Sequence, residues 1–207
     1  MAGATSKPVT VKCRLGVDDQ DVETTLPHFI ETVAEAGCTH FIIHARKAWL
    51  QGLSPKENRD VPPLDYDIVH AMKAAFPDMH ISLNGGLAAL EEGLPHLSTL
   101  DGLMYGRAAY HQPWDILSDA DEKVFDAAPR TNTRADVVQQ MLPYIDAHVA
   151  RGGKLGQVTR HMLGLFAGQP GARSWRRTLS DNAHRAGAGS ALVLEALDAV
   201  QTAQEPA

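Results

Sequence analysis

Two apolar segments of this chain each run into glycine and then into helix-forming sequence. They are Ile81–Gly86, which ends in Asn-Gly-Gly, and Leu100–Arg107, which ends in Gly-Arg. A strand that stops at glycine before a helix exposes main-chain N–H groups, which bind anions such as phosphate. In (β/α)8 barrels, the loops after strands 7 and 8 commonly form a phosphate site. The two segments therefore predict the closing end of such a barrel.

Strand patterns alternate with helix patterns through the first part of the chain. Strands are expected at 9–15, 41–43, 79–83 and 100–105, and helices at 22–36, 66–76, 87–97 and 116–125. Such alternation is typical of parallel strands joined by helical crossovers. A whole barrel needs about 250 residues, so four units in about 125 residues predict half of one. An open doubly wound sheet is the alternative. Such a sheet binds its ligand at the point where the strand order reverses, whereas the candidate ligands here lie at the ends of four successive strands.

After residue 126 the alternation stops and helical patterns take over. Residues 127–132 are expected to form a linker, followed by helices at 133–149, 157–167, 172–184 and 190–202. The predicted fold class is α/β plus all-α. Residues 1–126 are expected to be the C-terminal half of a TIM (β/α)8 barrel with four βα units, and residues 133–207 a small helical-bundle domain.

The charge of the helical part differs from that of the whole chain, which carries a formal charge of −6. From Arg151 to Arg185 there are seven Lys and Arg residues and one acidic residue, Asp181. Arg173 and Arg176 lie three residues apart, on one face of a predicted helix. A one-sided arginine face is typical of proteins that bind nucleic acid phosphates. A solvated helix surface is the alternative.

The composition excludes several classes of protein. A content of 44% hydrophobic and 21% charged residues is that of a globular protein. No apolar run approaches the roughly 20 residues that cross a bilayer, and residues 1–8 lack the apolar segment of a signal peptide. Cys13 and Cys38 have no metal-binding spacing and are expected to be reduced thiols. These features predict a cytoplasmic protein with no metal, no membrane partner and no obligate protein partner.

Polar side chains lie on or directly after the first two predicted strands. Lys12 lies within the first, and His44 directly follows the second. A lysine that points into a barrel needs a partner, and a histidine at the carboxyl end of a barrel strand is a candidate site residue. An exposed edge strand and a structural histidine are the alternatives. The long connection 45–65, which carries Lys56 and Arg59, indicates either an active-site loop for an anion or a solvated loop.

Taken together, these segments resemble the tRNA-dihydrouridine synthases, in particular the bacterial A subfamily that acts on positions 20 and 20a. The resemblance extends from Pro8 to about Val200. It rests on an ordered set of motifs, namely Val9–Arg14, Ile42–Lys47, Leu53–Arg59, Asn84–Gly86, Gly106–Arg107, His161–Phe166 and Gly171–Arg177.

The resemblance implies a flavin-dependent enzyme that reduces the 5,6 double bond of uridines in the D-loop of tRNA, with FMN as cofactor and NADPH as reductant. It implies that the following residues hold FMN: Lys12, His44, Asn84, Gly85, Gly86, Gly106 and Arg107. It also implies that Lys56, Arg59, Arg173 and Arg176 contact tRNA.

The sequence also departs from the family's pattern. The first four barrel strands, and the cysteine that protonates the uracil ring, have no counterpart here, and neither Cys13 nor Cys38 matches that cysteine. No catalytic residue is therefore assigned. The chain is expected to be the C-terminal portion of such an enzyme, to be inactive alone, and to bind FMN weakly if at all. A non-catalytic RNA-binding or vestigial product is the alternative. A third class, a barrel enzyme acting on a small molecule, is disfavoured because such an enzyme would not need the arginine face.

Overall fold

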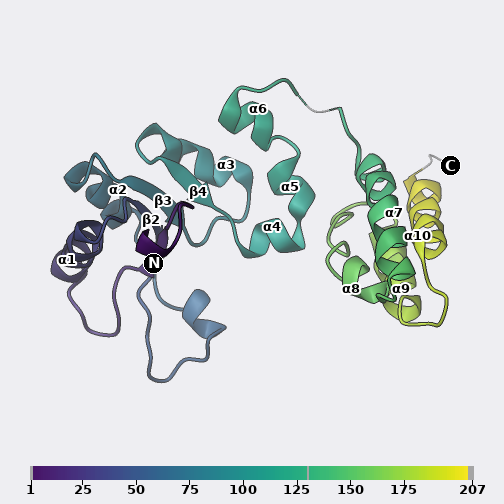
Figure 1. Cartoon of the computed structure of the whole chain (residues 1–207), viewed down its shortest axis with the longest axis horizontal. Coiled ribbons are helices and arrows are strands. Elements are labelled where there is room, and N and C mark those ends of the chain that lie inside the picture. Colours follow the sequence, from purple (N-terminus) through teal and green to yellow (C-terminus); the bar gives the residue numbers. More distant parts are fainter. Residues whose placement is uncertain (1, 130, 205–207) are drawn as a thin grey trace. The chain divides into compact units, whose positions relative to one another are not determined.

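The chain divides into two compact units, Met1–Gly106 and Arg107–Ala207, in the computed structural model (Figure 1). The structure describes residues 2–129 and 131–204. The predicted linker at 127–132 lies inside the second unit, and its Arg130 is outside the described residues, as are Met1 and 205–207. The domain boundary taken from the sequence therefore stays a prediction.

The first unit is built on a parallel sheet of four strands. They are β1 (Val11–Arg14), β2 (His40–His44), β3 (His80–Asn84) and β4 (Gly102–Met104), and they lie in the order β1-β2-β3-β4. Each strand pairs in parallel with the next one along the chain. The predicted parallel α/β arrangement is thus confirmed, and its strictly sequential order is consistent with part of a barrel, because an open doubly wound sheet reverses its strand order.

Two helices cover one face of this sheet (Figure 1). They are α1 (Val22–Glu35) and α2 (Tyr66–Ala75), close to the predicted ranges. Asp21 and Asp65 cap their N-termini by accepting hydrogen bonds from the main-chain N–H of Glu23 and Ile68. Their apolar residues share a core with alternate residues of the strands: Leu26, Ile30, Ile68, Val69, Met72, Phe41, Ile43, Ile81 and Leu83.

The helix predicted at 87–97 is wrong in its extent. The structure has α3 (Leu90–Gly93) followed by a 3₁₀ segment (Leu94–Ser98). Pro95 has no N–H with which to continue the hydrogen bonds of α3, and from Leu94 on the chain takes the tighter 3₁₀ form. Two further 3₁₀ segments are Ala2–Ala4 and Glu57–Arg59.

The second unit begins with three short helices where the sequence predicted one at 116–125. They are α4 (Arg107–His111), α5 (Pro113–Leu117) and α6 (Ala120–Phe125). Pro113 explains the separation of the first two, because proline is accepted in the first turn of a helix and not within one.

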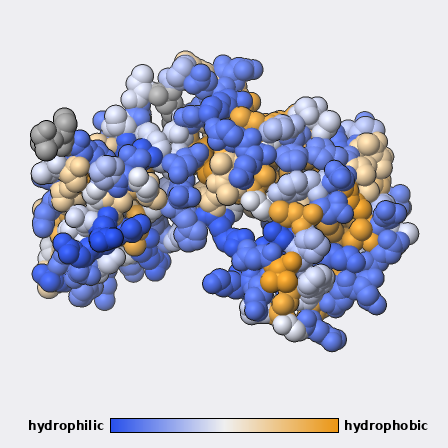
Figure 2. All heavy atoms as spheres, turned by 180° about the vertical axis from the view of Figure 1, so that it is seen from behind, coloured by the Kyte–Doolittle hydropathy of each residue, from blue (hydrophilic) through white to orange (hydrophobic). Residues whose placement is uncertain are grey.

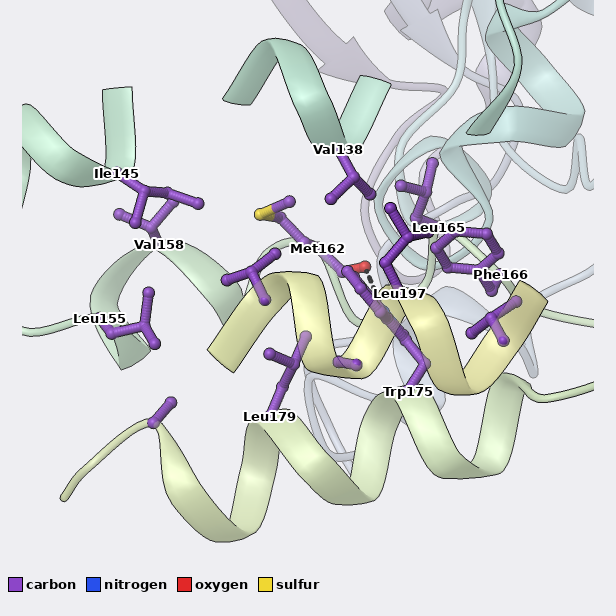
Figure 3. Packing of buried hydrophobic residues seen from close by; sticks show 14 of the residues in the cluster. Val138, Ile145, Leu155, Val158, Met162, Leu165, Phe166, Trp175, Leu179 and Leu197 are labelled. Carbon is purple, nitrogen blue, oxygen red and sulfur yellow. Dashed lines mark hydrogen bonds between the residues drawn. The ribbon is translucent and has the colours of Figure 1, made fainter. Parts of the chain in front are cut away.

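Four later helices share a core around Trp175, which is fully buried (Figure 3). They are α7 (Arg134–Ala150), α8 (Gly156–Thr159), α9 (Ala172–Asn182) and α10 (Ser190–Gln204). The indole N–H of Trp175 donates to the main-chain oxygen of Met162 at 3.2 Å. The helix predicted at 157–167 ends at Thr159 and continues as turns. Within the described residues, no helix is both long enough and apolar enough to cross a membrane.

Candidate functional site

The carboxyl ends of the four strands bring several predicted ligands to one edge of the sheet. Arg14, His44, Asn84 and Met104 are neighbours in register, and Lys12 lies one row back beside Ile42. Side chains of one parity project from one face of a sheet. Because α1 and α2 cover the face that carries the other parity, Lys12, His44 and Asn84 share the opposite face.

The loop after β3 has a backbone that requires glycine twice. Gly85 has φ 111° and Gly86 has φ 75°, both in the region that side chains avoid. A Cβ on Gly85 would lie 2.9 Å from Nε2 of His44, and one on Gly86 would lie 2.7 Å from the hydroxyl oxygen of Tyr66. The loop is therefore packed against side chains from β2 and α2, and its own main chain is what it can offer to a ligand.

The loop after β4 is joined to the same edge. The side-chain amide of Asn84 donates to the main-chain oxygen of Met104 at 2.7 Å, which ties the ends of β3 and β4 together. A Cβ on Gly106 would meet nothing within 4 Å, so the space beside this glycine is open. Arg107 follows directly and begins α4, in the second unit.

The helices after these two loops are shorter than the sequence predicted. α3 has 4 residues and begins at Leu90, several residues after Gly86, while α4 has 5 residues. A short helix adds little dipole, so an anion here would be bound mainly by individual N–H groups and by charged side chains.

Positive charge gathers on the sheet face that carries Lys12. Burial lowers the pKa of Lys12, and the neighbouring charge of Arg14 lowers it further. Burial likewise lowers the pKa of Arg14, followed by repulsion from Arg59 and Arg46. By accessible surface Lys12 is exposed and Arg14 is partly buried, so both can be reached from solvent. The repulsion between these cations is relieved by a bound anion, so this edge favours a phosphate or another anionic group.

The connection 45–65 is an ordered loop anchored on β1. Nη1 of Arg14 donates to the main-chain oxygens of Lys47 and Asn58, both at 2.8 Å. Asn58 also pairs with Trp49 in both directions, accepting from its N–H at 2.8 Å and donating to its oxygen at 2.5 Å. Alternation along β1 puts Arg14 on the face of Lys12, but no local pattern in the sequence signals that Arg14 anchors the loop.

The four predicted tRNA contacts are exposed side chains. Lys56 directly precedes the 3₁₀ segment Glu57–Arg59 in the anchored loop, and Arg59 is the last residue of that segment. Arg173 and Arg176 lie on α9, on the side opposite to its buried residues, which include Trp175. The first pair belongs to the first unit and the second pair to the second unit.

Neither cysteine is placed as a reactive group. Cys13 projects from the face of β1 opposite to Lys12, and burial raises its pKa to about 11, against the opposing charge of Lys12. Cys38 is buried, with its Sγ 3.5 Å from the main-chain oxygen of Val9. The described part of the chain holds no group of three or more His, Cys, Asp or Glu residues that could bind a metal ion.

The surface of the first unit carries exposed apolar side chains among its polar ones. Figure 2 shows several hydrophobic patches among hydrophilic side chains on the unit formed by Met1–Gly106. Leu50, Val61 and Met104 are among its exposed large apolar residues. Leu50 and Val61 belong to the loop anchored by Arg14, and Met104 ends β4, so apolar surface accompanies the charged groups of this edge.

Comparison with known sequences identifies the family to which these features belong. The family model described as dihydrouridine synthase (Dus) matches residues 1–204. The chain is 54% identical over 195 residues to the tRNA-dihydrouridine(20/20a) synthase of Shewanella oneidensis, which covers 94% of this chain and 58% of that protein. It is 52% identical over 201 residues to the protein of the same name from Escherichia coli strain K12, covering 97% of this chain and 58% of that protein.

A third relative gives the same picture. The tRNA-dihydrouridine(20/20a) synthase of Vibrio cholerae is 52% identical over 191 residues, covering 92% of this chain and 58% of that protein. The resemblance expected from the motifs is therefore confirmed. The chain spans 58% of the length of these curated relatives.

Proposed function

The chain belongs to the dihydrouridine synthase family, and from this premise we propose that it is part of an FMN-dependent tRNA-dihydrouridine(20/20a) synthase. The reaction is reduction of the 5,6 double bond of uridines in the D-loop of tRNA, with NADPH as reductant. The observation that carries the proposal is the shared sheet face of Lys12, His44 and Asn84 beside the closely packed Gly85–Gly86 loop.

The residues at this edge fit the two anionic parts of FMN. Lys12 supplies a positive charge for the edge of the flavin ring, which is anionic when reduced. The main chain of Asn84, Gly85, Gly86 and Gly106, together with the side chain of Arg107, would hold the phosphate end. His44 packs on Gly85 and would contact the cofactor from the same side. When bound, FMN supplies the hydride that adds to the uracil ring.

Binding of tRNA is assigned to the exposed cations of both units. Lys56 and Arg59 are held by the loop that Arg14 anchors, so their positions are set before tRNA arrives. Arg173 and Arg176 would contact phosphates through the exposed face of α9. We assign no general acid to this chain, because Cys13 is a partly buried thiol on the opposite face of β1 and Cys38 is a buried thiol that precedes β2.

The first experiment measures the product in cells. Deleting the gene that contains this coding sequence should remove dihydrouridine from positions 20 and 20a of tRNA, measured by mass spectrometry of tRNA digests, and restoring the whole gene should return it. Unchanged dihydrouridine in the deletion strain, with tRNA still bound by the purified protein, would favour the non-catalytic RNA-binding alternative.

The second experiment measures the cofactor site. FMN binding to the purified chain is followed by quenching of flavin fluorescence. Lys12→Met should weaken binding about tenfold or more, because a charge-assisted contact is lost. Lys7→Met is the matched control, since Lys7 is exposed in the segment before β1 and should not affect binding. Equal affinities for the two variants would contradict the assignment of Lys12.

A further inference from the structure

We propose that Tyr66 is a positioning residue of the phosphate loop: its hydroxyl holds the peptide between Gly85 and Gly86 in the orientation that presents Gly86 N–H to a phosphate group. The inference rests on the proposed function, in which this loop binds the phosphate of FMN. The sequence predicted Tyr66 only as the first residue of a helix. It lies outside the motifs that carry the family resemblance, so no binding role followed from them.

The geometry of the peptide gives the reason. The Tyr66 hydroxyl donates to the main-chain oxygen of Gly85 at 2.8 Å. In a planar trans peptide the N–H of the next residue points opposite to the carbonyl oxygen. Because the Gly85 oxygen faces Tyr66 at the start of α2, the Gly86 N–H faces away from that helix. Among the described residues, the main-chain hydrogen bonds outside helices and strands include none donated by Gly86 N–H, so this donor is available.

Without such a bond, a peptide between two glycines turns over easily. Glycine populates positive and negative φ almost equally, and both residues here have positive φ. The turned peptide would present the Gly85 oxygen in place of the Gly86 N–H, and this oxygen repels a dianion. A fixed orientation is therefore required if the loop is to bind phosphate.

Side chains packed closely against Gly85 and Gly86 support the same orientation of the peptide between them. A Cβ on Gly86 would lie 2.7 Å from the Tyr66 hydroxyl oxygen, and one on Gly85 would lie 2.9 Å from Nε2 of His44. Leu64 also contacts both glycines. The hydroxyl is thus in van der Waals contact with the segment whose carbonyl it binds, and a phenyl ring could keep the packing but not the hydrogen bond.

Tyr66 is itself held by main-chain contacts with the two neighbouring loops. Its predecessor Asp65 caps α2 and donates from its N–H to the oxygen of Ala45 at 2.9 Å. The N–H of Ala45 in turn donates to the oxygen of Asn84 at 2.9 Å. The ends of β2 and β3 and the start of α2 are therefore connected, and the Tyr66 ring has an anchored position relative to the glycine loop.

The hydroxyl also stays a donor under the conditions of the reaction. Burial raises the pKa of Tyr66, and the nearby carboxylate of Glu92 raises it further, against the opposing charge of Arg46. The phenol therefore keeps its proton throughout the neutral range, where the phosphate group of a flavin is anionic.

The test uses Tyr66→Phe in the full 207-residue chain, with Tyr105→Phe as the matched control. Tyr105 donates to the main-chain oxygen of Leu90 at 3.0 Å, so its variant loses a bond of the same kind elsewhere in the first unit. The first readout needs no ligand: the amide NMR signal of Gly86. Tyr66→Phe should shift and broaden it as the peptide turns over, and Tyr105→Phe should leave it unchanged. An unchanged Gly86 signal in Tyr66→Phe overturns the inference whether or not the chain binds flavin.

The second readout compares FMN with riboflavin, which lacks the phosphate, in titrations up to millimolar concentration. Tyr66→Phe should weaken FMN binding about fivefold, the effect of one ordinary hydrogen bond, while riboflavin binding changes less than twofold. A loss that is equal for both flavins points to general destabilisation and overturns the positioning role. A wild-type chain that does not prefer FMN to riboflavin contradicts the proposed function, and the first readout still decides the role of the hydroxyl in holding the peptide.

Discussion

The guanidinium of Arg14, at the end of β1, donates to the main-chain oxygen of Asn58 across 2.8 Å. The same nitrogen donates to the oxygen of Lys47, so one side chain joins two points of the 45–65 loop to the sheet. The stretch between these two points carries Lys56, one of the predicted tRNA contacts. The position of the exposed cations thus depends on a residue more than thirty positions earlier in the chain.

Loosening this loop should be measurable by hydrogen exchange. Asn58→Ala removes both side-chain bonds to Trp49, so amides of residues 47–60 should exchange about tenfold faster, as local opening becomes easier. Asn182→Ala is the control, because it removes one bond within α9, from Nδ2 to the oxygen of Thr178 at 2.8 Å. Unchanged exchange in Asn58→Ala would contradict a role of this side chain in holding the loop.

Asp101 should contribute to the stability of the first unit. Its Oδ2 lies 2.8 Å from Nζ of Lys73 and accepts from the N–H of Ile81 at 2.8 Å. Asp101→Ala should lower the free energy of unfolding by about 1–2 kcal/mol, because the buried N–H of Ile81 loses its acceptor. The exposed Asp78, in the turn before β3, provides the control. Asp78→Ala should change the free energy of unfolding by less than about 0.5 kcal/mol, and both variants are measured by urea unfolding followed by circular dichroism.

The same contact predicts an acid dependence. Burial alone would raise the pKa of Asp101, but hydrogen bonds from Lys73 and from Ile81 N–H outweigh it, and the pKa in the folded chain is lowered from 3.8. The stabilisation is therefore present above this unfolded value and is lost as the pH falls through the lower, folded value. A difference between wild type and Asp101→Ala that did not shrink below about pH 4 would contradict this account.

Cys13 should be unreactive in the folded chain at neutral pH. Its pKa of about 11 means that the thiolate, the reactive form, is scarce at pH 8. The rate of Cys13 alkylation, measured by mass spectrometry, should keep rising with pH up to about 11 in the folded chain. In urea, the rate should level off near pH 9.0, the reference pKa of a thiol.

Because the pKa of Cys13 is raised in the folded chain, this thiol also stabilises the fold below pH 9.0, its reference value, and the contribution is lost as the pH rises toward 11.

The arginine face of α9 should make tRNA binding depend on salt. Replacing both Arg173 and Arg176 with Ala should weaken binding and reduce the slope of log K against log salt by about 2, since each phosphate contact contributes about 0.9. The double variant Arg151→Ala with Arg185→Ala removes the same charge from exposed positions outside α9. Equal effects of the two double variants would assign the dependence to net charge and not to this face.

Trp175 should be the most costly residue of the helical core to replace. It is fully buried, packs edge-on against Phe166 with ring centroids 4.9 Å apart, and donates to Met162 (Figure 3). Trp175→Ala should lower the free energy of unfolding by about 3–5 kcal/mol, mainly through the cavity it leaves. Tyr144→Ala, at a residue that is 54% exposed, should cost less than about 1 kcal/mol in the same urea titration.

Long elements with caps and regular apolar spacing were predictable because their signals are local. The predicted ranges of α1, α2 and α10 agree with the structure to within two residues at each end. The predictions were wrong where several short elements share one apolar pattern, as at 87–97 and 116–125. There, a proline decides between an α-helix, a 3₁₀ turn and a break, and apolar spacing does not reveal which.

The sequence by itself determined the alternation of parallel strands with helices, the glycine loops at the strand ends and the alternation that puts Lys12 and Arg14 on one face of β1. Each of these depends on a pattern within a few neighbouring residues. Only the tertiary structure decided that Arg14 holds Asn58 and that Tyr66 holds Gly85, because those bonds join residues 44 and 19 positions apart. Their geometry follows from the register of the strands and the path of the loops, which no local pattern encodes.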